Sequence, residues 1–115
     1  MSAEIANILR AAKALIQTPE SWCQGDDSVH GQDGRVARCS KQAIAEAAGN
    51  AKDRQHYRAA AYNALLRAAD AEAPIACGWT GICAWQDVPE RTHIQVMDAF
   101  DHAIAAEEAL AGVKP

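Results

Sequence analysis

The stretch AEIANILRAAKALIQ, residues 3–17, repeats apolar side chains at intervals of three and four positions. This is the period of one buried face of an α-helix, so we expect a helix from Ala3 to Gln17. The pair Thr18-Pro19 should end it, because the residue before a proline avoids the helical region. The apolar residues of the buried face are Ile5, Ile8, Leu9, Ala12, Leu15 and Ile16.

Three further helices are expected on the same grounds. One begins near Ser40, which suits the N-cap, and ends at Gly49-Asn50. Another covers about Lys52 to Ala71. The last begins at Asp87 or at Thr92, since each is followed three positions later by an acid or an amide, as in a capping box. The residues expected to be buried on the third helix are Tyr57, Ala61, Ala64, Leu65 and Ala68.

Two irregular segments separate these helices. The segment from Glu20 to Arg38 contains three glycines and three aspartates, and its Asp33-Gly34 pair predicts a turn followed by a short extended piece. We expect the segment Ile75–Trp85, with two glycines, to be a turn-rich or briefly extended connection. A short two-stranded ribbon near Arg35–Ala37 and Ile75–Trp79 is an open option.

The chain has 115 residues, and half of them are apolar although only 5% are aromatic. An alanine-rich core favours closely packed helices over a sheet. The fold class is therefore predicted to be mainly α, as a small single domain over residues 1–115. It has about four helices and two irregular loop segments. No apolar stretch approaches the ~18 residues of a membrane span, so no contact with a membrane is expected.

Basic residues concentrate in the middle of a chain whose net charge is −4. Residues 35–67 carry seven Lys or Arg against two acids. We nevertheless expect no nucleic-acid partner, because the pI is about 5.5 and stacking aromatics are scarce. We expect oppositely charged helices to neutralise each other. The basic residues retained as candidate binding residues are Arg35, Arg38, Arg54 and Arg58.

The four cysteines are Cys23, Cys39, Cys77 and Cys83. No export signal precedes them, which indicates the reducing cytoplasm and free thiols. They form no Cys-x-x-Cys pair, so we expect neither a metal nor a cofactor. One alternative stays open, a zinc-stabilised domain that uses some of these thiols together with His30.

Cys39 is the best candidate for chemistry. It lies at or just before the start of a predicted helix, where the helix dipole lowers the pKa of a thiol, and Arg35 and Arg38 are near it in sequence. The alternative function is therefore a cysteine-dependent hydrolase, with Gln24 as an oxyanion donor. Its base and orienting acid would come from His93, His102, Asp98 and Asp101. No spacing in the sequence enforces this geometry.

Motifs in the two irregular segments resemble those of a family of small bacterial and phage domains of unknown function. The family form reads W-x-Q-G, D-x-x-G-R, C-x-x-G-A-[ILV] and W-N-D-x-P-x-R-T, followed by a helix ending D-x-A-I. The resemblance covers nearly the whole chain and implies an architecture without naming a reaction. The chain departs from the family form at Gln42, in place of glycine, and at Gln86, in place of asparagine. The stretches on which the resemblance rests are Trp22-x-Gln24-Gly25, Asp33-Gly34-Arg35, Cys39-x-x-Gln42-Ala43-Ile44, Trp85-Gln86-Asp87-x-Pro89-x-Arg91-Thr92 and Asp101-His102-Ala103-Ile104.

The last irregular segment predicts a clamp. Asp87 is expected to accept a hydrogen bond from a backbone N–H of the final helix. Arg91 would then pair with an acid of the Trp22–Asp33 loop and pin that loop to the helix start. The alternative is a small anion held by the helix N-terminus and Arg91.

The tryptophans divide into two classes. Trp22 and Trp85 are expected to anchor the core, because large rings are scarce in this chain. Trp79 lies between glycines in a predicted turn, where an exposed ring suits a partner surface. The other candidate binding residues outside the basic set are Trp22, Gln24, Trp85, Asp87 and Arg91. The sequence therefore favours a non-enzymatic, cytoplasmic module that binds another protein in a phage or mobile-element setting. The sequence leaves open whether the chain also forms a homo-oligomer.

Overall fold

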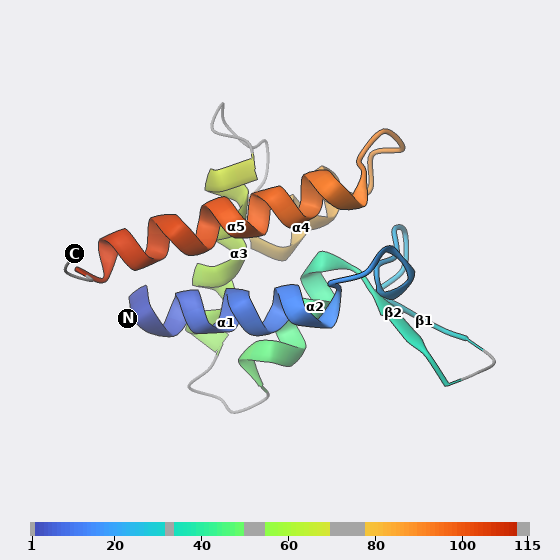
Figure 1. Cartoon of the computed structure of the whole chain (residues 1–115), viewed down its shortest axis with the longest axis horizontal. Helices are drawn as coiled ribbons and strands as arrows, with labels where there is room; N and C mark the ends of the chain where they lie inside the picture. Colours follow the sequence, from blue (N-terminus) through green and yellow to red (C-terminus); the bar gives the residue numbers. More distant parts are fainter. Residues whose placement is uncertain (1, 32–33, 50–54, 70–77, 113–115) are drawn as a thin grey trace.

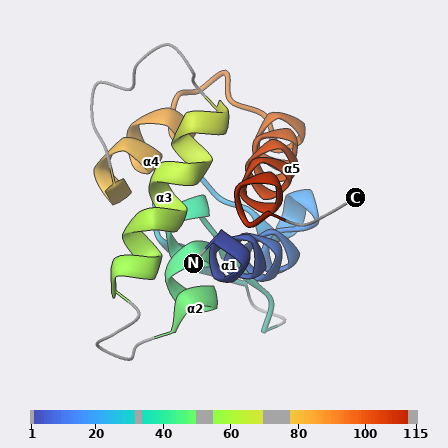
Figure 2. The same ribbon diagram turned by 90° about the vertical axis from the view of Figure 1, so that its left-hand side faces the viewer.

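Two long helices, α1 (Ser2–Leu15) and α5 (His93–Leu110), lie side by side and antiparallel (Figures 1 and 2). They belong to a computed structural model that describes residues 2–31, 34–49, 55–69 and 78–112. Lys13 Nζ pairs with Asp101 Oδ1 at 2.7 Å, and Arg10 pairs with Glu108. The two helices thus carry opposite charges where they meet, although the charge pattern had assigned the basic role to residues 35–67.

Three further helices complete the body: α2 (Ser40–Ala48), α3 (Gln55–Ala69) and α4 (Gly78–Gln86). Helix α3 packs against all four others, and α2 also packs on α1. Each helix supplies at least one fully buried side chain to one hydrophobic core. These side chains include Leu9, Ile44, Leu65, Ile82 and Phe100. The prediction of a mainly α fold is confirmed, with five helices rather than about four in the described part of the chain.

The predicted helix boundaries hold to within a few residues. The first helix stops at Leu15, shortly before Thr18-Pro19, and α2 ends at the C-cap Gly49, where a positive φ of 86° favours glycine. Lys52 and Ala71, the predicted limits of α3, lie outside the described residues. Tyr57 and Ala68 are only partly buried. The sequence reasoning had not expected Tyr62 and Leu66 in the core.

Strands β1 (Ser28–His30) and β2 (Val36–Arg38) form an antiparallel ribbon, called the arm from here on. Figure 1 shows the arm projecting away from the helices, beyond the short 3-10 helix η1 (Pro19–Ser21). The extended piece at Arg35–Ala37 is confirmed in substance, and Gly34 turns the chain with a φ of 85°. Asp33 lies outside the described residues.

The predicted partner of that strand was wrong. The strand pairs with the nearby Ser28–His30, because a short hairpin closes a much smaller loop than a pairing with residues 75–79 would. Residues 75–77 lie outside the described part of the chain, and Gly78 and Trp79 begin α4.

Helix α4 replaces most of the predicted connection at Ile75–Trp85. Its buried side is set by Ile82, Trp85 and Gln86, at positions i, i+3 and i+4 of a helix. Two glycines at its start obscured this period, because glycine disfavours a helix. Trp79 therefore stands in a helix and not in a turn, which corrects the argument that made it a partner-binding residue.

Among the described helices, none combines the length and the apolar character that crossing a membrane requires.

Candidate functional site

The side chain of Gln86 joins three parts of the fold. It is 1% exposed, at the C-terminal end of α4. Its Oε1 accepts the indole N–H of Trp22 at 2.9 Å and the backbone N–H of Ser40. Its Nε2 donates to Asp87 Oδ1 at 2.7 Å. A buried amide with both ends bonded fixes the parts that it joins, because breaking any of these bonds leaves a buried polar group without a partner.

The start of α2 depends on this amide. The first backbone N–H groups of a helix lack partners within the helix. Here Ser40 N–H donates to Gln86, and Gln42 N–H donates to Cys39 Sγ at 3.3 Å. Cys39 is therefore the N-cap of α2, one position before the predicted Ser40.

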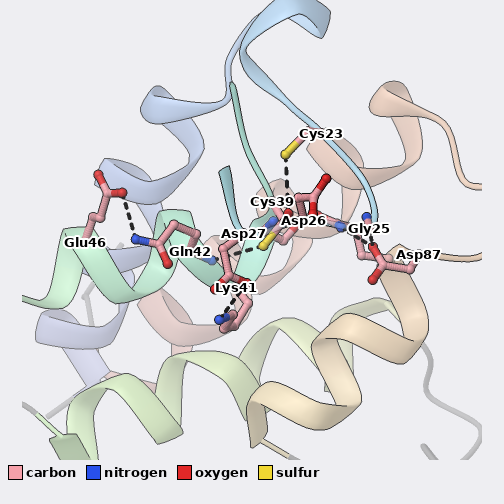
Figure 3. A network of polar contacts seen from close by, with 11 residues as sticks. Cys23, Gly25, Asp26, Asp27, Cys39, Lys41, Gln42, Glu46 and Asp87 are labelled. Carbon is pink, nitrogen blue, oxygen red and sulfur yellow. Dashed lines mark hydrogen bonds and ion pairs between the residues drawn. The ribbon is translucent and has the colours of Figure 1, made fainter. Parts of the chain in front are cut away.

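Gln24 and Asp87 tie the segment before the arm to the end of α4. Gln24 Nε2 donates to the carbonyl oxygens of Gln86 at 2.8 Å and Val88 at 2.9 Å. Gly25 N–H donates to Asp87 Oδ1 at 3.0 Å, as Figure 3 shows. The predicted loop clamp exists, although other residues make it.

Two predicted contacts of this clamp are corrected. Asp87 does not cap the last helix, because its carboxylate is held by Gly25 and Gln86. Thr92 is the N-cap of α5 and forms the capping box with Gln95. The Gln95 backbone N–H donates to Thr92 Oγ1 at 3.1 Å, and the Thr92 backbone N–H donates to Gln95 Oε1 at 3.0 Å. Thus the second of the two predicted helix starts is the right one.

Arg91 also contacts a different partner from the one predicted. Its Nε donates to the carbonyl oxygen of Trp85 at 3.0 Å, and its guanidinium carbon lies 4.6 Å from the centre of the Trp85 ring. Stacking of this kind holds a guanidinium in place. The predicted ion pair with an acid of the Trp22–Asp33 loop is not formed among the described residues.

Arg91 and Trp85 line an open groove of about 350 Å³ between α3, α4 and α5. Gln95, Asp98 and His102 face the same groove from one side of α5. The groove thus gathers two of the predicted binding residues and two of the candidate hydrolase residues. It does not contain Cys39.

The thiol of Cys39 is buried at the start of α2. The residue is 4% exposed, and burial raises the pKa of the Cys39 thiol above its ordinary value. The hydrogen bond from Gln42 N–H and the charge of Lys41 lower this pKa, but burial outweighs them. The expectation that the helix start would lower the pKa is therefore wrong, because loss of water dominates.

The candidate partners of Cys39 have other contacts. His93 Nε2 lies 2.8 Å from the carbonyl oxygen of Ile16, and the His93 ring lies 5.9 Å from the Trp22 ring. Gln24, the proposed oxyanion donor, uses its amide nitrogen to hold the backbone of α4's end. Asp101 pairs with Lys13.

Cys23 and Cys83 share the raised pKa of Cys39. Burial raises the pKa of Cys23 to about 11, and the neighbouring Cys39 and nearby carboxylates add to this effect. Burial and the charge of Asp87 raise the pKa of Cys83. All three are free thiols. No group of three metal-ligating side chains occurs in the described residues, and Cys77 lies outside them.

Two of the candidate basic residues, Arg38 and Arg58, make contacts within the fold. Arg38 pairs with Glu46 at 2.7 Å, and Arg58 Nη2 donates to the carbonyl oxygen of Gly49 at 2.7 Å. Arg35 lies on the arm beside a hollow of about 230 Å³. Arg54 lies outside the described residues. Arg38 and Arg58 thus serve the attachment of α2 (Figure 3 shows Glu46 of this helix bonded to Gln42).

The residue that the sequence reasoning missed is Gln86. It had been noted only as a departure from the family form. The sequence does contain a signal for it. Gln86 follows Ile82 by four positions and Trp85 by one, so it lies on the buried side of any helix that contains these two apolar residues.

Residues 1–106 match the model of a family described as a family of unknown function, DUF6197. The chain belongs to this family. The expected membership in an uncharacterised domain family is thereby confirmed. Among curated proteins and solved structures, no match was found. For this DUF6197 domain the fold and the contacts above are the basis for a proposed function.

Proposed function

We propose that this DUF6197 domain is a non-enzymatic protein-binding module that docks partners through its arm. The single observation that supports the proposal is the outer edge of β1. Its backbone groups have no partner in the part of the chain that the structure describes. An edge of this kind is a template for a strand from another polypeptide.

The hydrogen bonds at the two ends of the ribbon identify which backbone groups point outward. Gly31 N–H donates to Arg35 O at 2.7 Å, and Cys39 N–H donates to Asp27 O at 2.9 Å. Opposite residues in an antiparallel ribbon alternate between bonded and non-bonded pairs. Val29, between these two pairs, therefore bonds to β2, and Ser28 and His30 direct their N–H and C=O groups away from it.

The opposite edge of the ribbon is covered at Arg38. Cys23 N–H donates to Arg38 O at 3.1 Å, and Trp22 forms a parallel bridge with Arg38. The β1 edge carries no such contact within the described residues, so it offers the longer place for a further strand. Its sequence, Ser-Val-His, contains neither the lysine nor the proline that commonly protects an edge.

The arm is presented in a fixed position. The segment before the arm is attached to the end of α4 by the contacts of Trp22, Gln24 and Asp87. The residue directly after the arm, Cys39, is the N-cap of α2. A rigid docking element loses less conformational entropy on binding. Val29 is 46% exposed, beside the hollow that Arg35 lines, so an added strand finds an apolar contact there.

Two finer expectations from the sequence belong to this proposal. The first is a cytoplasmic location, which the free thiols of Cys23, Cys39 and Cys83 support. The second is a phage or mobile-element setting, which rests on the resemblance in sequence motifs alone.

The experiment that tests the proposal is selection of a displayed random-peptide library on the immobilised domain. Enriched peptides are then titrated by calorimetry. We expect them to bind the wild type and Ser28→Ala, whereas Ser28→Pro abolishes binding because proline removes an outward N–H. Equal binding to Ser28→Pro, or no enrichment at all, would contradict the proposal.

A second pair of variants tests whether the peptide binds at the arm. Val29→Asp should weaken peptide binding at least tenfold. Ile94→Asp should leave it unchanged, because Ile94 is 71% exposed on α5 and does not belong to the arm. Loss of binding in both variants would place the peptide elsewhere and contradict docking at the arm.

A further inference from the structure

We propose that the β1 edge accepts the β1 edge of a second copy of this chain, in an antiparallel pairing centred on Val29. This inference rests on the proposed function, because it takes the edge as a docking surface. It goes further by naming the occupant.

The backbone of β1 is self-complementary about Val29. The two residues with outward backbone groups, Ser28 and His30, lie one position on either side of it. A two-fold axis at Val29 sets Ser28 of one copy opposite His30 of the other, and each such pair exchanges both of its hydrogen bonds. All outward groups of the strand are then satisfied.

The side chains at this register are compatible. Val29 faces Val29 of the second copy in a non-bonded pair, where Cβ atoms approach to about 4.5–5.5 Å. Each valine, 46% exposed in the single chain, thereby covers the other. Asp27 comes opposite Gly31, so no like charges face each other.

The neighbouring register, centred on Ser28, fits less well. It would set the Asp27 carboxylate against Val29 of the second copy. It would also use the backbone of Asp26, whose carbonyl oxygen already accepts from the Cys23 thiol at 3.4 Å (Figure 3). The pairing at Val29 avoids both costs.

The contact is small, since only the arms meet. Interfaces that bury less than about 1,200 Å² in total are typical of weak and transient association. We therefore expect a monomer–dimer equilibrium with a micromolar or weaker dissociation constant, visible as the protein concentration is raised.

The experiment is sedimentation equilibrium on the full chain over a wide concentration range, with a pair of charge variants. Val29→Asp and Val29→Lys should each be monomeric, because like charges would face each other across the axis. An equimolar mixture of the two should recover a dimer, because opposite charges then face each other. A heterologous binding site would not produce this recovery.

Further variants separate the backbone from the side chain. Ser28→Ala should dimerise like the wild type and Ser28→Pro should not. Ile94→Asp is the control for added surface charge. Circular dichroism and the melting temperature verify that each variant is folded.

Each outcome has a defined meaning. A wild type that stays monomeric at the highest concentration, or a dimer that persists in Val29→Asp, overturns the second copy as occupant. Selected peptides that bind a monomeric wild type would still support the proposed function. The two proposals therefore fail separately.

Discussion

The carboxamide oxygen of Gln86 accepts the indole N–H of Trp22 at 2.9 Å, across 64 positions of the sequence. The same oxygen accepts the backbone N–H of Ser40 at the start of α2. One side chain thus connects the segment before the arm, the helix after the arm and the end of α4. The position of the arm depends on this side chain.

Replacing Gln86 by leucine should lower the free energy of unfolding by about 3 kcal/mol. The variant leaves the N–H groups of Trp22 and Ser40 buried without an acceptor, and such losses are among the largest that single substitutions cause. Urea unfolding measures the change. Gln17→Leu, at an exposed position, should change the stability by less than about 0.5 kcal/mol, and similar values for both variants would contradict the role of Gln86.

Thr92→Ala should cost about 1 kcal/mol, because its hydroxyl accepts the Gln95 N–H at the start of α5. Amide hydrogen exchange at Gln95 should accelerate. Exchange at Gly25 should not change, since its amide donates to Asp87.

Asp87→Ala should have the reciprocal effect. The Gly25 amide should exchange faster, because it loses the carboxylate at 3.0 Å, and the Gln95 amide should keep its protection. If Asp87→Ala exposed Gln95 instead, Asp87 would be acting as the cap of α5 after all.

Cys39 should react slowly with iodoacetamide at neutral pH. Its thiol is buried and its pKa is raised, so the reactive thiolate is scarce and poorly accessible. Mass spectrometry of digested protein gives the rate at each cysteine. A rate at Cys39 above that of a free-cysteine peptide would revive the hydrolase hypothesis.

The stability should fall as the pH rises from about 9 towards 11. The pKa of Cys23 is raised from its ordinary value of 9.0 to about 11, so the unfolded chain releases this proton at a lower pH than the folded one. The stabilisation is complete below the pKa of the Cys23 thiol in the unfolded chain. It is lost as the pH rises through the higher pKa of this thiol in the folded chain. Cys23→Ser should show a shallower decline in urea unfolding. Identical declines in the two proteins would contradict this assignment.

Helices with a continuous apolar period could be predicted from the sequence. For α1 and α5 the period is carried by residues such as Leu9 and Phe100, which are fully buried. Such patterns work because a surface helix must bury one face, whatever it packs against.

Long-range polar contacts could not be predicted in the same way. Asp87 and Thr92 both suit an N-cap by sequence. In the fold, however, the Asp87 carboxylate accepts a hydrogen bond from the backbone N–H of the distant Gly25. Similarly, the start of α2 favours a low thiol pKa for Cys39, but the burial that reverses it depends on the whole fold. The partner of β2 could have been found from loop length, since Ser28–His30 is much nearer in sequence than residues 75–79.

The antiparallel pairing of α1 with α5 has a practical consequence. The first residues of α1 and the last residues of α5 lie together at the end of the body opposite the arm (Figure 1). A fluorophore or a surface linker attached to the first turn of α1 or to the last turn of α5 is therefore held at the opposite end of the body from the arm. Immobilised molecules would present their arms to the solution.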